Sequence, residues 1–358
     1  MIRISANSAV TFNASLVSSN ATTLAIHAGA GSRVVFNDLF MSRGNGRVSG
    51  SGTIVFNGPY HCRDRFYSAT VDDSFTGTIE LHSTGNRFNG WLGTWTDGTI
   101  KTMVPYAFTA QNTRRVTSSS DATNNPIDGD QRTCLRMGGT ATLDLCGNDQ
   151  SFGNMRTTDG GTITSETPAT LFMDFTEEWH SADGTYMLRA DKATYTGAVN
   201  YSKWGALPRW FMAASTSTGI VEVAEGKIVF TRAATDASDQ VDLTDGTATA
   251  VNEPRVRGSW RNASAVVIKG GKMVFEHSEA VGRHTDVRFE KMNNAYGKLR
   301  LESGVRQQVG YLYIDGVKQQ TGSYGSTSSS ATHQDDALFE GEGVIEVTGD
   351  SPFIMIFK

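Results

Sequence analysis

The sequence predicts an all-β protein, and two features of the chain support that fold class. Short strands that begin with glycine and then alternate apolar with polar residues recur along the chain, with neighbouring copies at similar intervals. Gly77 and Gly98 are 21 residues apart, and Gly197 and Gly219 are 22 apart. Apolar residues spaced as on one face of a helix are nowhere sustained for about three turns. A regular interval of this length predicts a stacked β repeat, which we expect to form one continuous domain over residues 1–358.

The predicted strands follow one another from the start of the chain. Residues 1–58 hold short strands separated by Asn, Ser and Gly turns, and residues 77–81 continue them. Residues 82–136 contain prolines, tryptophans and a polar run, so we expect an irregular excursion there. Regular strands return later in three stretches: residues 138–164, 194–230 and 263–302. Residues 311–317 predict a hairpin with an Asp-Gly turn, the start of C-terminal capping coils at 311–358.

Among all-β repeats, a single-stranded parallel β-helix, a solenoid with loop excursions, fits the interval best. A propeller needs repeats of about 40–50 residues, and a sandwich places turns every 8–12 residues without a longer register. In a β-helix, inward residues of successive coils stack in apolar columns about 4.8 Å apart. We expect such columns from Ile79, Leu81, Ile228, Phe230, Met273 and Phe275, and water-facing positions at Glu80, Lys227, Lys272 and Arg300. The glycines that lead the strands are expected to supply positive φ at the corners.

Composition excludes some classes of function. The net charge is −5 and no basic stripe is present, which argues against nucleic acid as a partner. No apolar run approaches the roughly 18 residues that span a bilayer, so membrane insertion is not expected. The chain has three cysteines, of which Cys146 follows a strand and is expected to be a small buried residue. Met1 is expected to be an added start on a fragment of a longer exported precursor, whose signal peptide has been removed.

Three strand motifs carry a resemblance to a known family. Residues 52–58 read Gly-Thr-Ile-Val-Phe-Asn-Gly, residues 74–81 read Ser-Phe-Thr-Gly-Thr-Ile-Glu-Leu, and residues 195–199 read Tyr-Thr-Gly-Ala-Val. These motifs resemble the passenger-associated transport repeat of bacterial autotransporters. The resemblance implies a right-handed parallel β-helix that is secreted or displayed on the cell surface. It implies no single activity, because passengers of this kind include adhesins, proteases and other enzymes.

Aromatic residues in the irregular segments are the candidates for ligand binding. Trp91 and Trp95 lie in the first excursion, and Glu178 and Trp179 lie in a second one after residue 173. Sugar rings stack on exposed aromatic faces while carboxylates accept hydrogen bonds from their hydroxyls, so a glycan site is the functional interpretation. The structural alternative is that these tryptophans cover the sides or ends of the stack, each burying about 150–250 Å².

Asp72 and Asp73 are the candidates for catalysis. Glycoside hydrolysis needs two carboxylates about 5–10 Å apart, which an adjacent pair and an acidic neighbour one coil away can supply. The alternative is a solvated turn before the next strand. A polysaccharide lyase would use a basic residue, and Arg114 and Arg115 lie near several aspartates, but no calcium-loop motif accompanies them. No zinc motif or other cofactor motif is present, so we expect neither metal nor cofactor.

The leading hypothesis is a non-enzymatic, surface-exposed or secreted bacterial β-helix, an adhesin-like or scaffold segment that binds glycans or other polymers of a cell surface. The alternative is a carbohydrate-active enzyme on the same fold, either a polysaccharide lyase or a glycoside hydrolase. A third interpretation is a structural stalk that projects another domain.

Overall fold

The chain divides into two compact units, Met1–Thr176 and Glu177–Lys358, each of which is described by itself. The computed structural model describes residues 2–17, 25–42, 47–58, 60–62, 75–83, 87–88, 97–105, 134–152, 154–174, 190–242 and 252–349. Within these ranges every regular element is a β-strand and no helix occurs, so no helix long and apolar enough to cross a membrane is found there. The all-β fold class is confirmed.

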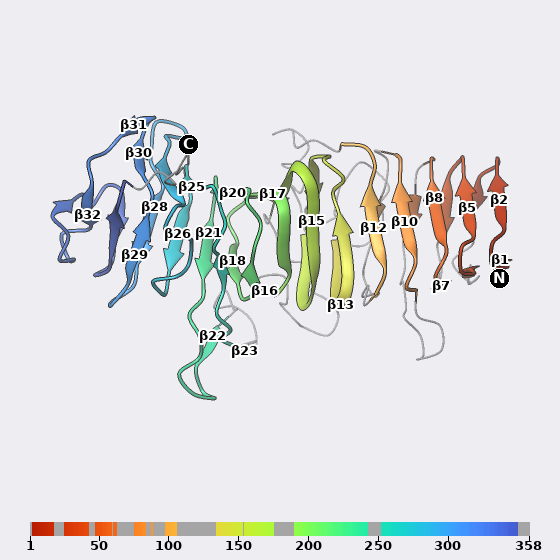
Figure 1. Cartoon of the computed structure of the whole chain (residues 1–358), viewed down its shortest axis with the longest axis horizontal. Coiled ribbons are helices and arrows are strands. Elements are labelled where there is room, and N and C mark those ends of the chain that lie inside the picture. Colours follow the sequence, from red (N-terminus) through yellow and green to blue (C-terminus); the bar gives the residue numbers. More distant parts are fainter. Residues whose placement is uncertain are drawn as a thin grey trace, which may run out of the picture. The chain divides into compact units, whose positions relative to one another are not determined.

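The first unit consists of parallel ladders (Figure 1). Its strands are β1 (Ile2–Ile4), β2 (Ala9–Phe12), β3 (Leu16–Val17), β4 (Ala25–Ala28), β5 (Arg33–Phe36), β6 (Phe40–Ser42), β7 (Arg47–Gly50), β8 (Thr53–Phe56), β9 (Tyr60–Cys62), β10 (Thr78–Leu81), β11 (Arg87–Phe88), β12 (Thr99–Thr102), β13 (Cys134–Asp144), β14 (Gln150–Phe152) and β15 (Asn154–Asp174). One ladder runs β2–β5–β8–β10–β12–β13–β15, and it is flanked by β1–β4–β7 and β3–β6–β9–β11. Strands consecutive in sequence therefore mostly enter different ladders.

The second unit repeats this arrangement with two long parallel ladders. Its strands are β16 (Ala190–Asp191), β17 (Thr194–Trp204), β18 (Pro208–Phe211), β19 (Ala214–Ser215), β20 (Ile220–Val223), β21 (Lys227–Phe230), β22 (Gln240–Asp242), β23 (Asn252–Pro254), β24 (Ser259–Trp260), β25 (Ala265–Ile268), β26 (Lys272–Phe275), β27 (Asp286–Phe289), β28 (Lys298–Leu301), β29 (Arg306–Val309), β30 (Leu312–Ile314), β31 (Val317–Lys318), β32 (Gly322–Gly325), β33 (His333–Gln334), β34 (Phe339–Glu340) and β35 (Val344–Val347). One ladder runs β17–β20–β25–β27–β30, and the other runs β16–β18–β21–β26–β28–β34.

Like residues lie opposite one another in these ladders, as the alternating pattern predicts. The central column of the first unit is completely apolar and at most 3 % exposed, and it consists of Val34, Ile54, Ile79, Ile100, Leu143 and Ile163. In the second unit, Phe211, Phe230 and Phe275 form a column in register. All six residues expected to face inward are buried, and the four expected to face water are half-exposed or exposed. Alternation over four-residue strands was therefore sufficient to identify the core.

Aromatic and amide side chains form two further columns in the first unit. The rings of Phe12, Phe36 and Phe56 stack with centroids 5.0 and 5.3 Å apart. One residue further along each strand, the Asn37 amide donates to the Asn13 oxygen, and the Asn57 amide donates to the Asn37 oxygen, each at 2.7 Å. Such ladders of identical side chains are typical of in-register parallel strands.

Antiparallel pairs of strands occur at three places in the described part of the second unit, besides an isolated antiparallel bridge between Met292 and Ala295. The hairpin β22–β23 lies after β21, and its Val241 joins Trp210, Val229 and Val274 in an apolar cluster on the outer side of the sheet. Near the C-terminus, β30 pairs antiparallel with β31, and β32 pairs antiparallel with β35. The predicted Asp-Gly turn is present, because Asp315 and Gly316 both have positive φ (47° and 77°).

One local expectation is confirmed only in part, and another is wrong. Of the repeat glycines, Gly98 and Gly197 have the expected positive φ (79° and 66°), whereas Gly77 and Gly297 do not. Instead, a Cβ at Gly77 would lie 2.1 Å from the Gly52 carbonyl oxygen, and one at Gly297 would lie 2.0 Å from the Gly271 carbonyl oxygen, so these glycines allow close approach of neighbouring repeats. Cys146 is half-exposed in a turn with φ of 50°, although burial still raises the pKa of its thiol to about 11.

Candidate functional site

All six residues predicted from the sequence as site residues lie outside the described part of the structure. They are Asp72, Asp73, Trp91, Trp95, Glu178 and Trp179. The glycan and catalytic hypotheses attached to them therefore stay predictions. Among the described residues, no group of three or more His, Cys, Asp or Glu that could hold a metal ion occurs.

A surface with several tyrosines lies on the outer side of β27 and β30. Val287, Phe289 and Leu312 are fully buried, so the residues that alternate with them point outward. Arg288 lies opposite Tyr313 in the parallel register, and the Tyr311 carbonyl accepts a hydrogen bond from Val287. We call the surface formed by Asp286, Arg288, Lys291, Tyr296, Tyr311, Tyr313, Asp315 and Lys318 the tyrosine face.

Each tyrosine of this face has a cation beside its ring. The Lys318 ammonium lies 3.5 Å from the Tyr311 ring centroid, and the Arg288 guanidinium carbon lies 5.5 Å from that of Tyr313. The rings of Tyr311 and Tyr313 are 6.3 Å apart and inclined at 62°. A cation within about 6 Å of a ring is attracted by its negative face. These contacts restrain the side chains, so that two half-exposed rings are held side by side.

The third tyrosine is fixed at the turn of the β30–β31 hairpin. The Tyr296 hydroxyl donates a hydrogen bond to the Asp315 carboxylate, and the Lys291 ammonium lies 3.1 Å from that carboxylate and 4.9 Å from the Tyr296 ring. The hydrogen bond from Tyr296, together with the charge of Lys291, holds the pKa of Asp315 below its usual value. The same bond to Asp315 raises the pKa of Tyr296. Asp315 is therefore a charged acceptor at neutral pH.

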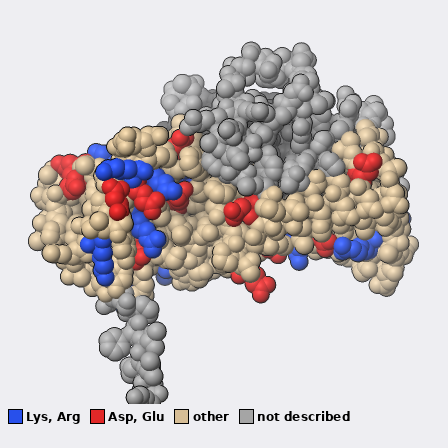
Figure 2. Space-filling view, turned by 90° about the horizontal axis from the view of Figure 1, so that it is seen from above, with Lys and Arg blue, Asp and Glu red and all other residues tan. Residues whose placement is uncertain are grey.

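Ion pairs continue along the outer side of the same ladder. The Lys269 ammonium lies 2.8 Å from Glu222 and 3.7 Å from Glu290, and Arg288 donates to Asp286 at 3.0 Å. Figure 2 shows basic and acidic side chains interspersed in one group on the face it views, with much of the remaining described surface carrying neither. The tyrosine face thus offers apolar ring surface together with hydrogen-bond donors and acceptors of both charges.

The tyrosine face carries groups that are suited to binding a ligand. Stacking on an amphipathic ring combined with charged hydrogen-bond partners is the usual means of recognising polyhydroxylated ligands, because each sugar has an apolar face and a rim of hydroxyls. Val317, which is 64 % exposed at the tip of the hairpin, adds apolar area at the edge.

A second group of ionisable residues lies in the core and has a structural role. Asp191, Tyr195 and Arg209 are fully buried, and Asp191 accepts hydrogen bonds from Tyr195 at 2.7 Å and from Arg209 at 3.1 Å. Burial, with the charge of Asp191, raises the pKa of the Tyr195 hydroxyl well above its usual value. Because all three side chains are fully enclosed, we assign the cluster a role in stabilising the fold.

The sequence contained a signal for the tyrosine face that the prediction did not use. Tyr-x-Tyr within a strand places both rings on one side, and residues 311–317 were predicted only as a hairpin. The cationic partners of the tyrosines were not predictable, because the number of residues between paired positions varies from one repeat to the next. Val267 pairs with Arg288, 21 residues later, whereas Arg288 pairs with Tyr313, 25 residues later.

Comparison with known proteins adds no identification: no family model, no curated protein and no solved structure matches this chain.

Proposed function

We propose that this chain is an exported bacterial protein of the autotransporter-passenger type, secreted or displayed on the cell surface, whose tyrosine face binds glycans. The observation that carries the proposal is the pair of half-exposed rings, Tyr311 and Tyr313, held side by side by Lys318 and Arg288. The transport-repeat motifs at residues 52–58, 74–81 and 195–199 support the export route.

The fold that we propose for this function is a right-handed, single-stranded parallel β-helix. Strand β15 supports it, because three parts of this single strand pair in turn with three earlier segments: residues 154–156 with 134–136, residues 162–164 with 142–144, and residues 171–173 with 150–152. A chain that winds in coils is expected to pair in this way, because each coil lies against the preceding coil segment by segment. Right-handed crossovers account for about 98 % of parallel connections, which supports the proposed handedness.

The tyrosine face suits an extended glycan better than a small enclosed ligand. Its rings and charges lie on the outer side of a sheet, so a ligand gains contacts by lying across several strands. Charged partners of both signs, Arg288 and Asp315 among them, allow hydrogen bonding to hydroxyls without demanding a charged ligand. The proposed ligand class is therefore a surface glycan or polysaccharide.

A glycan array with the purified chain tests this function, with paired assays for reducing sugars and unsaturated products. Binding without turnover is the expected result. The variant Y313A is expected to bind about ten-fold more weakly, which corresponds to about 1.4 kcal/mol and is within the range of one aromatic contact. The matched control Y313F keeps the ring and is expected to bind within about two-fold of the parent.

Three results would reject this function. Release of sugars or unsaturated products would replace it with the enzymatic alternative, a hydrolase or lyase on the same fold. An array without any bound glycan would favour the stalk. Equal affinity of Y313A and the parent for the same glycan would place the binding site elsewhere on the chain.

A further inference from the structure

Lys318 completes a row of side chains across three neighbouring strands of the tyrosine face. In the parallel register, Arg288 of β27 lies opposite Tyr313 of β30, and in the antiparallel register of the hairpin, Tyr313 lies opposite Lys318 of β31. Side chains directly opposite one another lie on the same side of a sheet. The outer side of this sheet therefore carries a cation, an aromatic ring and a second cation in one line.

The two cations of this row differ in their partners. Arg288 donates a hydrogen bond to the Asp286 carboxylate at 3.0 Å. The Lys318 ammonium instead lies 3.5 Å from the centroid of the Tyr311 ring, and among the residues that the structure describes no carboxylate forms an ion pair with it. An ammonium has three N–H donors, and one ring face cannot accept all of them. Lys318 therefore keeps donors available for a ligand while the ring holds it in place.

The acidic residue at the turn of this hairpin is engaged by other groups. Asp315 lies three residues before Lys318 in the sequence. Its carboxylate accepts a hydrogen bond from the Tyr296 hydroxyl and lies 3.1 Å from the Lys291 ammonium. Both carboxylates of the tyrosine face are thus paired with cations other than Lys318. The face carries one more positive charge than it has counter-ions.

This additional charge lies within reach of a ligand that stacks on Tyr313. The ring centroids of Tyr311 and Tyr313 are 6.3 Å apart, and the Lys318 ammonium lies against the first of them. A sugar ring is about as wide as the aromatic ring on which it stacks, so the substituents at its rim extend to the neighbouring ring and the ammonium beside it. A carboxylate gains most there, because a charge-assisted hydrogen bond is stronger than a neutral one.

We propose that the tyrosine face prefers acidic glycans, and that Lys318 binds the carboxylate of a uronic acid or similar sugar whose ring stacks on Tyr313. The proposal rests on the glycan-binding function proposed above and names the class of glycan. Tyr313 contributes to the binding of neutral and acidic sugars alike, whereas Lys318 selects the acidic ones. Arg288 contributes less to this selection, because Asp286 already neutralises it.

The test compares acidic polymers with forms of the same polymers whose carboxyl groups have been reduced to alcohols. The full chain is titrated with hyaluronate, alginate and polygalacturonate, each beside its reduced form, at low and at physiological salt. At least one acidic polymer is expected to bind about three- to five-fold more tightly than its reduced form, which is the contribution of one exposed ion pair. The difference is expected to shrink as salt rises, because salt screens exposed charges.

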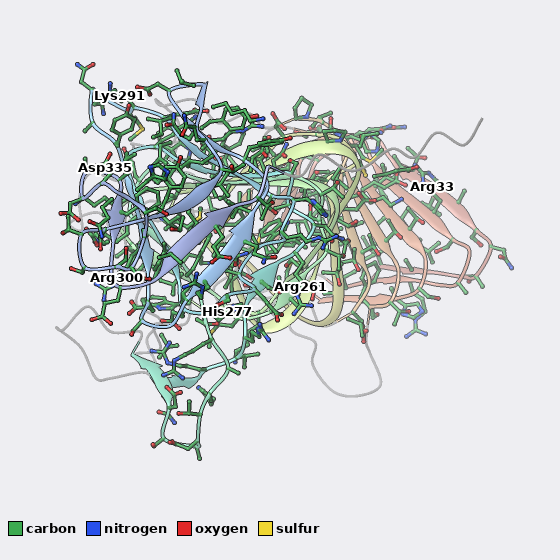
Figure 3. The ribbon with its side chains drawn as sticks, turned by 60° about the vertical axis from the view of Figure 1, so that its left-hand side comes forward. Arg33, Arg261, His277, Lys291, Arg300 and Asp335 are labelled. Atoms are coloured by element: carbon green, nitrogen blue, oxygen red, sulfur yellow. The ribbon has the colours of Figure 1, made fainter. Side chains whose placement is uncertain are left out.

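The variant K318Q is expected to lose this preference. Its binding to the acidic polymer falls about three- to five-fold, and its binding to the reduced form changes by less than about two-fold. K318R keeps the charge and is expected to keep the preference. The matched control is R300Q, which removes a positive charge at a side chain that is 46 % exposed and lies outside the tyrosine face. Figure 3 shows Arg300 well separated from Lys291 of that face.

R300Q is expected to bind both forms of each polymer within about two-fold of the parent, and circular dichroism establishes that each variant is folded. Equal effects of K318Q and R300Q would overturn the proposal. Equal affinity of the parent for the acidic and reduced forms of all three polymers would overturn it too, as would the absence of binding to any acidic polymer.

The variant Y313A separates this proposal from the function on which it rests. Weaker binding of both forms by Y313A, together with an unchanged preference in K318Q, would overturn the proposal and leave the glycan-binding function in place. Lys318 would then serve to discourage the pairing of a further strand beside β31. The function itself fails only if the glycan array also shows no binding.

Discussion

At the scale of single residues, the buried pair of Asp191 and Arg209 is the most consequential polar contact described. Both side chains are fully buried, and Asp191 also accepts hydrogen bonds from the Tyr195 hydroxyl and the Ala193 amide. The Tyr195 ring stacks on Trp260 with centroids 4.6 Å apart. A buried charge without its partner is strongly unfavourable, so each member of the cluster requires the others.

We expect D191N to destabilise the protein by about 3–5 kcal/mol, because Arg209 would keep its charge in the core without a counter-ion. Denaturant unfolding measures the change. The matched control is E302Q, which removes the carboxylate of the exposed pair with Arg300 and is expected to cost less than about 1 kcal/mol. Similar losses for the two variants would contradict the assignment of Asp191 as a structural counter-ion.

His277 provides a prediction about pH. Its Nε2 lies 2.7 Å from the Gly258 carbonyl oxygen, and its Nδ1 accepts from the Glu279 amide at 3.2 Å and from Arg257 at 3.4 Å. This pattern requires the neutral ring. Burial, aided by the positive charge of Arg257, lowers the pKa of His277.

Because folding lowers this pKa below the unfolded value near 6.5, the stability that His277 contributes is fully present above that pH. It is lost as the pH falls from there to the lowered pKa of the folded state. Free energies of unfolding measured across this range are expected to depend less on pH in H277Q than in the parent. The exposed histidine variant H284Q is the control, and a pH profile for H277Q identical to that of the parent would refute the prediction.

At the scale of elements, the spacing between repeats depends on glycines that allow close approach. Gly297 precedes β28, where a side chain would overlap the Gly271 carbonyl oxygen of the preceding repeat. Gly304 differs, because it has φ of 80° and no atom lies within 4 Å of the position its Cβ would take. Alanine substitutions at these two positions therefore distinguish the cost of steric overlap from the cost of backbone strain.

We expect G297A to destabilise the protein by about 3 kcal/mol or more, because the parallel strands β26 and β28 would have to move apart. G304A is expected to cost about 1–2 kcal/mol, the penalty of a left-handed conformation alone. Thermal and denaturant unfolding of the two variants measure the difference. A smaller loss for G297A than for G304A would mean that the repeats tolerate a wider spacing at this corner.

The elements also show what the sequence can and cannot predict. Ile79 and Phe275 were identifiable as core residues because alternation within one strand determines which side faces inward. The partners of outward residues were not identifiable, because they depend on loop lengths: Lys227 precedes Lys272 by 45 residues, and Lys272 precedes Lys298 by 26. The tyrosine face is likewise built across repeats, so identifying it required the register as well as the strands.

At the scale of the whole molecule, each repeat contacts chiefly the repeats beside it in its ladder. Stability in such proteins is approximately a sum of local terms and nearest-neighbour terms. A substitution in one unit is therefore expected to weaken nearby strands more than distant ones, even though the chain is continuous.

Hydrogen exchange tests this locality. In D191N we expect faster amide exchange in β16, β18 and β21, with little change in β5 and β8 of the first unit. Exchange measured by mass spectrometry resolves these segments, and the E302Q variant provides the baseline. A uniform loss of protection from β2 to β35 would instead indicate that the chain unfolds as a single cooperative body.

The aligned side chains of the first unit have a consequence for how this protein can change in length. Phe36 stacks on Phe12 below and Phe56 above, and Asn37 likewise bridges Asn13 and Asn57. A tandem duplication of one such segment would present to its neighbours the same ring and the same amide that they already contact. The gain or loss of one such repeat is therefore expected to disturb the structure little. A duplication that includes Arg209 without Asp191 would instead bury a positive charge without its counter-ion.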